Sequence, residues 1–141
     1  MFHRKTEVLT SDGWKQITKL KKGELIWNGT HYFSKLKELQ KENRKREKHL
    51  VVYSDYLICE LDTTQFLTED DESPIFVPKT NIRGEIIPNF IADGSENLDC
   101  FKFREEKKVK VPLYNLHFPS PWRVFYVKYT ENTGVMVLGT C

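Results

Sequence analysis

The most informative stretch of this chain is its opening run, Met1-Phe2-His3-Arg4-Lys5-Thr6-Glu7-Val8-Leu9-Thr10-Ser11-Asp12-Gly13-Trp14-Lys15-Gln16-Ile17-Thr18-Lys19-Leu20-Lys21-Lys22-Gly23-Glu24-Leu25-Ile26. Within it, the β-branched residues Thr6, Val8 and Thr10 alternate with Glu7 and Leu9, which is typical of a strand. Ser11-Asp12-Gly13 then supplies residues that tolerate a positive φ, before the apolar pattern resumes. A second turn at Gly23-Glu24 precedes the apolar residues 25–27. The run therefore predicts a β-hairpin followed by a third strand.

Length and composition limit the class of protein. The chain has 141 residues, of which 39% are hydrophobic and 13% aromatic, so we expect one folded domain, residues 1–141, with a core of its own. A net charge of +2 gives no reason to expect a nucleic-acid partner. No apolar stretch approaches the roughly 18 residues that a membrane helix needs. We therefore expect a monomer that binds no membrane, in the cytoplasm or in a virion.

Cysteine and histidine positions give no support for a metal or cofactor site. Cys59, Cys100 and Cys141 are scattered, without metal-ligand spacing or a disulfide framework, which favours a reducing compartment. The four histidines are equally dispersed. Cys100, beside Lys102 and Arg104, can be interpreted as a reactive thiol or as a small buried hydrophobe.

The segment 34–48 is the only part of the chain with a helical pattern. It carries seven Lys or Arg against three acids, and Phe33, Leu36 and Leu39 recur at helical spacing, with Ser34 as the N-cap. The sequence therefore predicts a short helix here. Its basic face could contact phosphates, although a solvated helical face is the commoner meaning of such a run.

Most of the remaining chain reads as strands. Residues 50–61 predict a hairpin with its turn at Ser54 and Asp55. Further strands are predicted over 109–113, over 124–129 and, after a tight turn at 131–134, over 135–138. The acidic residues 69–72 predict a solvated turn, and the prolines and glycines of 78–100 predict an irregular segment.

The opening run resembles the first motif of the Hint family, the self-processing domains of hedgehog proteins and inteins. In that family the first residue is a Cys or Ser nucleophile, whereas this chain has Met1. The family's second motif, "Thr, x, x, His" after a strand, resembles residues 61–68, with Asp62 at the Thr place and Gln65 at the His place.

Two later stretches also resemble family motifs. The third motif, "Tyr, Asp, Leu" after an apolar strand, resembles residues 111–116, with Asn115 at the Asp place. The last motif ends in His-Asn before a Cys, Ser or Thr and resembles residues 134–140. Leu138 and Gly139 then stand at the His-Asn places and Thr140 follows them, while a one-residue slip would put Cys141 after the junction.

The resemblance implies both a fold and an activity. It implies an all-β Hint-type horseshoe of bent antiparallel strands, with the short helix as an insertion, 28–49 and 69–108 as variable connections, and both chain ends at the centre. It also implies autocatalytic peptide cleavage or splicing in cis on flanking polypeptide, without a cofactor. We therefore expect the chemistry of this copy to be impaired or absent, because a thioether cannot attack a carbonyl, a Gln cannot exchange protons, and neither Gly139 nor Thr140 has a carboxamide that could cyclise.

Several alternatives stay open at this point. The losses fit either a deliberately disabled version of an active element or a natural degenerate domain retained as a module, for example in a virus or phage protein. A different class is a small β-barrel interaction module. Its basic helix at 35–48 and the aromatic cluster at 122–129 would bind nucleic acid or a protein.

Overall fold

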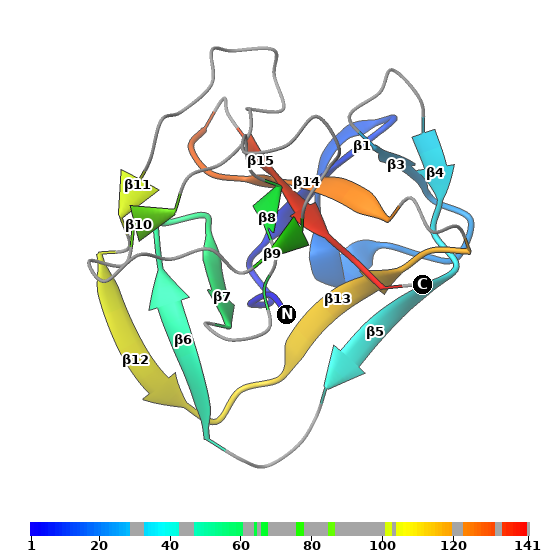
Figure 1. The fold of residues 1–141 in the computed structure, drawn as a ribbon. Helices are drawn as coiled ribbons and strands as arrows, with labels where there is room; N and C mark the ends of the chain where they lie inside the picture. The colour runs from blue at the N-terminus through cyan, green and yellow to red at the C-terminus, as the bar shows by residue number, and fades with distance from the viewer. Residues whose placement is uncertain are drawn as a thin grey trace.

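The computed structural model describes residues 1–28, 33–42, 47–60, 64, 104–119, 123–131 and 134–140 in full, and the strand pairing alone for 66–67, 76–77, 85–86 and 101–102. Figure 1 shows the chain as a set of short, strongly bent strands. In the described part, the only helical element is one short 3₁₀ turn. No described helix has the length and apolar composition needed to cross a membrane.

The opening run folds as its residues predict. Strands β1 (Glu7–Thr10) and β2 (Gly13–Gln16) form an antiparallel hairpin, followed by the 3₁₀ helix η1 (Ile17–Lys19) and by β3 (Leu25–Trp27). The two turn glycines have positive φ, 96° at Gly13 and 88° at Gly23, which residues with a Cβ rarely adopt. The predicted hairpin and third strand are confirmed.

The predicted helix over 34–48 is wrong. Strands β4 (Phe33–Lys35), β5 (Glu38–Glu42) and β6 (Lys48–Val52) occupy the described part of this segment. The three apolar residues behind the helical spacing do not share a face, because Phe33 is 42% exposed whereas Leu36 is buried. β5 pairs with β13 (Leu113–His117) along residues 38–42, so tertiary contacts override the local pattern.

The predicted hairpin at 50–61 is confirmed, since β6 pairs with β7 (Ile58–Glu60). The Ser54 hydroxyl accepts hydrogen bonds from the N–H groups of Tyr56 and Leu57 and so fixes the turn. Short strands follow: β8 (Phe66–Leu67), β9 (Phe76–Val77), β10 (Glu85–Ile86) and β11 (Phe101–Lys102).

The C-terminal part contains four longer strands: β12 (Glu105–Val109), β13 (Leu113–His117), β14 (Val124–Lys128) and β15 (Gly134–Leu138). The last two confirm the strands predicted over 124–129 and 135–138. The strand predicted over 109–113 is wrong, because β12 ends at Val109 and β13 begins at Leu113. Pro112 lies in this break, and proline has no N–H for a ladder.

The strands form one large sheet and three small ones, and every strand pair is antiparallel. The large sheet has the order β4-β3-β1-β14-β15-β8-β9, and β2 joins it by pairing with β1. β6 lies between β12 and β7, while β13 pairs with β5 and β10 pairs with β11. The all-β fold of bent antiparallel strands is confirmed, without its helical insertion.

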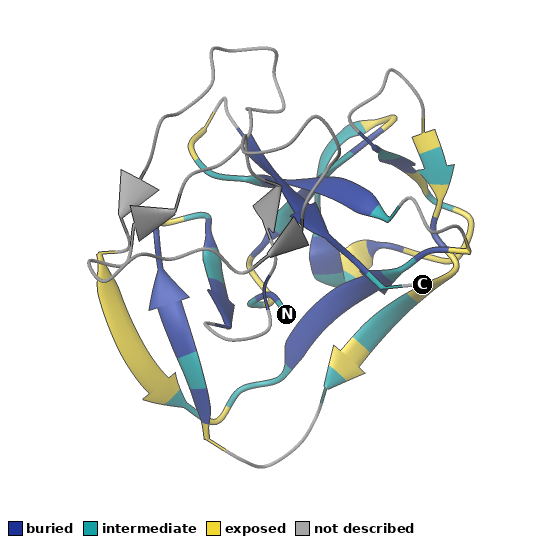
Figure 2. Ribbon diagram, in the orientation of Figure 1, coloured by how far each residue is buried: buried dark blue, intermediate teal, exposed yellow. Residues whose placement is uncertain are grey.

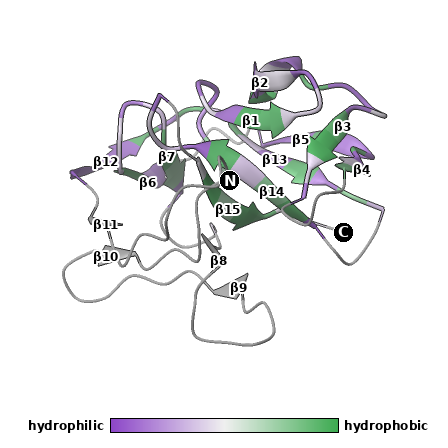
Figure 3. Cartoon of the chain, turned by 90° about the horizontal axis from the view of Figure 1, so that it is seen from above, coloured by the Kyte–Doolittle hydropathy of each residue, from purple (hydrophilic) through white to green (hydrophobic). Residues whose placement is uncertain are grey.

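The core lies around β13, β14 and β15, which are almost entirely buried (Figure 2). Alternate residues of β14 pack into different clusters: Phe125 and Val127 belong to the main core, whereas Val124 and Tyr126 belong to a smaller second cluster. Burial on both faces explains why β14 has apolar or aromatic residues at consecutive positions. The neighbouring β15 is buried along its whole length and is drawn in green in Figure 3.

Candidate functional site

The first residues of the chain are bonded to one edge of β13. The Phe2 N–H donates to the Tyr114 carbonyl over 2.7 Å, and the Tyr114 N–H donates back to the Phe2 carbonyl over 2.9 Å. Phe2 is buried and packs edge-to-face against Phe125, with ring centroids 5.7 Å apart. The start of the chain is therefore fixed as a short antiparallel extension of β13.

The last described residues are bonded to the same edge. The Thr140 N–H donates to the Leu116 carbonyl over 2.8 Å, and the Phe118 N–H donates to the Thr140 carbonyl over 2.8 Å. Thr140 thus runs parallel to β13, opposite His117. The other edge of β13 is covered by β5. Figure 1 shows the N-terminus and the end of β15 beside β13.

These pairings bring the two ends of the chain together. Their attachment points, Tyr114 and Leu116, are two residues apart, which is roughly 7 Å along a strand. Because Phe2 is antiparallel to β13 and Thr140 is parallel to it, the chain runs from Phe2 back to Met1, and from Thr140 back to Gly139, toward the stretch of this edge between the two points. The shared site of Met1, Gln65 and residues 138–140 that the resemblance implies stays a prediction, because Gln65 lies outside the described residues.

Next to Met1 lie a hydroxyl and a thiol. The Thr64 hydroxyl donates to the Met1 carbonyl oxygen over 3.2 Å and lies 3.2 Å from the Met1 nitrogen, from which it accepts. The Glu60 N–H also donates to the Met1 carbonyl. Cys59 and Phe2 form an isolated antiparallel β-bridge through their backbones. Burial lowers the pKa of the Met1 α-amino group and raises the pKa of the Cys59 thiol to about 12. Neither the hydroxyl nor this thiol exchanges protons near neutral pH.

Next to Thr140 lie an amide and an imidazole. The Thr140 hydroxyl donates to Gln40 Oε1 over 2.8 Å. His117 Nδ1 lies 3.0 Å from the Thr140 hydroxyl oxygen. In this arrangement the His117 N–H donates to the hydroxyl, whereas a flipped Gln40 amide would let the hydroxyl donate to the imidazole. Thr140 is therefore held by side chains from β5 and β13.

Gly139 is tightly enclosed by the main chain. A Cβ at this position would lie 2.5 Å from the Leu116 carbonyl oxygen and about 3.1 Å from the Phe118 ring. The Gly139 N–H donates to the Arg123 carbonyl over 2.7 Å, so the backbone cannot move away freely. Only a residue without a side chain fits between β13 and this turn.

Five of the eight predicted site positions are described. Met1 precedes the residue that pairs with Tyr114, Gly139 precedes Thr140, which pairs with the same edge of β13, and Leu138 is the buried last residue of β15. Asn115 is buried on β13, where its Oδ1 accepts the N–H of Leu116. Asp62, Gln65 and Cys141 lie outside the described residues, as do Cys100 and Trp122.

Sequence reasoning missed Thr64, His117 and Gln40. Thr64 directly precedes Gln65, so an alignment shifted by one residue would have indicated it. His117 is one of four histidines dispersed along the sequence, with nothing beside it that indicates a role. Nothing in the sequence links Gln40 to Thr140, which is 100 residues away. Among the described residues, no group of three or more His, Cys, Asp or Glu side chains could hold a metal ion.

The aromatic platform predicted over 122–129 does not form from the described residues. Phe125 is buried in the main core and Tyr126 in the second cluster, while Tyr129 packs against the main core. Burial raises the pKa of the Tyr126 hydroxyl above its ordinary range. The aromatic side chains of this segment therefore stabilise the fold.

No family model and no curated protein sequence matches the chain. Solved structures do match. A splice-inactive variant of the AceL NrdHF class 3 split intein gives a TM-score of 0.66 at 14% identity, covering 99% of this chain and 98% of that chain. The intein-like domain from Clostridium thermocellum gives 0.61 at 17% identity, covering 98% and 97%. The gp41-1 intein gives 0.58 at 16% identity, covering 99% and 97%.

These neighbours are all inteins or intein-like domains, and the likeness extends over nearly the whole chain. The chain therefore has the Hint fold of inteins. The resemblance seen in the sequence motifs is confirmed at the level of the fold.

Proposed function

We propose that this chain is an intein-like self-processing domain that acts in cis on polypeptide joined to its ends, and that its N-terminal step is impaired. The observation that supports the proposal is the pairing of Phe2 and of Thr140 with the same edge of β13, at Tyr114 and Leu116. A domain that cuts or joins at its own two ends requires both junctions within one site.

The residues at the N-terminal junction explain the proposed impairment. A thiol or hydroxyl at position 1 could attack the preceding carbonyl, but the thioether of Met1 has no proton to lose and no nucleophilic oxygen or thiolate. Thr64 can donate a hydrogen bond to a carbonyl oxygen at this junction, but it cannot protonate a leaving amine near neutral pH.

The C-terminal junction keeps more of its chemistry. The Thr140 hydroxyl is a nucleophile in type, and His117 is close enough to take its proton once the hydroxyl turns toward the ring. Gly139 offers no carboxamide for cyclisation. We therefore expect this junction to stay uncleaved, even though its hydroxyl is well positioned.

The proposal is tested with the chain fused between two reporter proteins and followed by intact-mass spectrometry, with and without added thiol. The unmodified chain should stay intact. Met1→Cys should give slow thiol-dependent release of the N-terminal reporter, and Met1→Ala, the matched control, should give none. Release by the unmodified chain would show that its N-terminal step is not impaired.

The position of the missing general acid is tested in the Met1→Cys background. Thr64→His should raise the rate of thiol-dependent release, because a general acid contributes about 100- to 10,000-fold and Thr64 contacts Met1. Gln65→His is the control for a histidine one residue away. Equal rates for Met1→Cys with Thr64→His and for Met1→Ala would refute the proposed self-processing site.

Gly139→Asn would restore a carboxamide at the C-terminal junction but should not restore cleavage. Its Cβ would meet the Leu116 carbonyl oxygen at 2.5 Å, and such overpacking typically costs about 1–3 kcal/mol. Gly139→Ala should show the same loss of stability in urea unfolding. If Gly139→Asn is as stable as the unmodified chain, the enclosure of Gly139 is not the limiting feature.

A further inference from the structure

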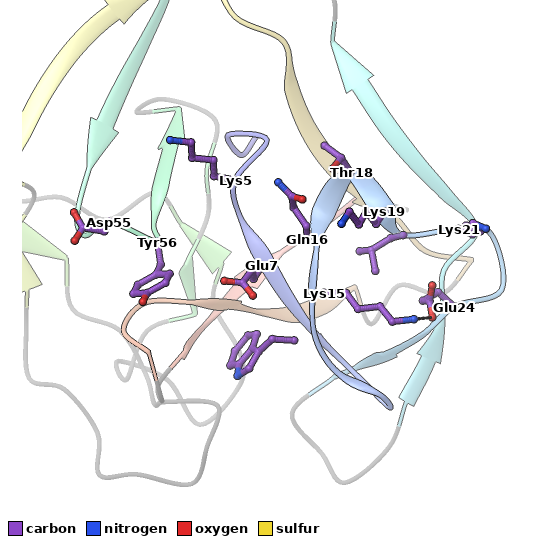
Figure 4. A pocket seen from close by; sticks show the side chains of 12 residues that line it. Lys5, Glu7, Lys15, Gln16, Thr18, Lys19, Lys21, Glu24, Asp55 and Tyr56 are labelled. Carbon is purple, nitrogen blue, oxygen red and sulfur yellow. Dashed lines mark hydrogen bonds and ion pairs between the residues drawn. The ribbon is translucent and has the colours of Figure 1, made fainter.

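A large open groove lies across the β1–β2 hairpin, away from the junction residues. It has a volume of about 1070 Å³ and is lined by the hairpin, the segment leading to β3, and the β6–β7 turn, as Figure 4 shows. We call it the hairpin groove. Pockets for small molecules are usually closed and about 300–1,000 Å³ in size, so an open groove of this volume fits an extended ligand better.

The acidic side chains of the hairpin groove are all neutralised by ion pairs. Glu24 lies 2.9 Å from the Lys15 ammonium group. Glu7 lies 3.5 Å from that of Lys128, and Asp55 lies 2.7 Å from the guanidinium of Arg104. These carboxylates therefore present little net negative charge to a ligand.

Three lysines of the groove are exposed and unpaired. Lys5 lies just before β1, while Lys19 and Lys21 follow β2, and all three side chains line the groove. No carboxylate among the described residues forms an ion pair with any of them. Because the acids are neutralised and these lysines are not, the groove is locally positive although the whole chain carries only +2.

Two aromatic rings complete the groove. Trp14 on β2 and Tyr56 in the β6–β7 turn both line it, and each is partly exposed. The Lys128 ammonium group lies 5.9 Å from the Trp14 ring centroid and 4.9 Å from that of Tyr56. This shared cation holds the two rings in place from two different parts of the fold.

We propose that the hairpin groove binds single-stranded nucleic acid. Lysines without an ion-pair partner beside partly exposed aromatic rings are the combination that holds a single strand, because ammonium groups neutralise its phosphates and aromatic rings stack with its bases. An acidic peptide would use the lysines but not the rings. The binding proposed here is independent of self-processing and requires neither junction.

The test is fluorescence anisotropy with a labelled single-stranded oligothymidylate of about a dozen nucleotides, titrated with the whole chain over a range of salt. We expect binding that weakens with salt. Lys5→Ala, Lys19→Ala and Lys21→Ala together should reduce the slope of log affinity against log salt by about 2, since each phosphate contact on a single strand contributes roughly 0.7.

A matched control uses three exposed lysines outside the groove. Lys37→Ala, Lys108→Ala and Lys110→Ala together remove the same charge and should leave the slope nearly unchanged. Tyr56→Leu keeps all charges and should weaken binding by about 5- to 150-fold, the usual effect of losing one stacked base.

Three results would overturn the proposal. They are no binding at low salt, an equal reduction of the salt slope in the two triple lysine variants, and competition by polyglutamate as effective as that by unlabelled oligothymidylate. The last result would assign the groove to acidic polypeptides. Circular dichroism of each variant shows whether the fold is intact, and Tyr56→Leu provides a test that does not depend on the lysine variants.

Discussion

On the N-terminal side of the junction, Met1 is bonded to a threonine hydroxyl and lies beside a protonated thiol, whereas on the C-terminal side Thr140 is bonded to an amide and an imidazole. Both ends are hydrogen-bonded to the same edge of β13, Phe2 antiparallel and Thr140 parallel to it. The two regions thus share a supporting strand and differ in the side chains that surround them.

This difference teaches that fold and chemistry depend on separate sets of atoms. Main-chain hydrogen bonds and the buried Phe2 ring hold the two ends against β13. The side chains around them can differ while this pairing is kept. The hairpin groove adds a third region, in which exposed charge and aromatic surface are retained away from the junction.

The largest effect is expected from breaking the frame on the N-terminal side. Phe2→Ala removes a fully buried ring that packs against Phe125, and such changes cost about 3–5 kcal/mol of unfolding free energy. Urea unfolding measures the loss. Leu25→Ala, at a side chain that is 38% exposed, is the control and should cost much less. A loss at Phe2 no larger than that at Leu25 would contradict the role given to the frame.

The next effect, which depends on pH, is expected from the buried thiol. Cys59 has a pKa of about 12 in the folded chain against an ordinary value of 9.0, so folding favours the protonated form. The contribution of this thiol to the free energy of unfolding is complete below pH 9. It is lost as the pH rises from 9 to 12, at about 1.4 kcal/mol per pH unit. Comparing Cys59→Ala with the unmodified chain in urea at several pH values isolates this loss. Rapid alkylation of Cys59 in the folded chain at pH 8 would contradict its burial.

The smallest effect is expected on the C-terminal side. Thr140→Val keeps the shape but removes the hydroxyl that joins Gln40 and His117, which should cost about 1 kcal/mol. Thr140→Ser retains the hydroxyl and should stay within a few tenths of the unmodified chain by urea unfolding. If Thr140→Ser lowers the free energy of unfolding as much as Thr140→Val does, the methyl group and not the hydroxyl stabilises this end of the chain.

Local sequence patterns predicted the elements whose conformation is determined by the residue types within one short segment. The β1–β2 hairpin follows from alternation and from glycine at a positive φ, and β14 and β15 follow from consecutive apolar residues that pack on both faces. The segment 34–48 failed because its spacing of three fits a helix, whereas pairing of β5 with β13, more than 70 residues away, makes it a strand. Local propensity contains no information about such a partner.

The sequence alone was enough for the family of fold and for the absence of a nucleophile at Met1, because both are read from residue types in order. It could not indicate Thr64 as the neighbour of Met1, nor join Gln40 and His117 to Thr140, nor show that Gly139 has no room for a Cβ. These contacts link positions far apart along the chain, and their distances depend on how β13 pairs with three other segments. Only the packed sheet fixes that pairing, and with it the chemistry that each junction retains.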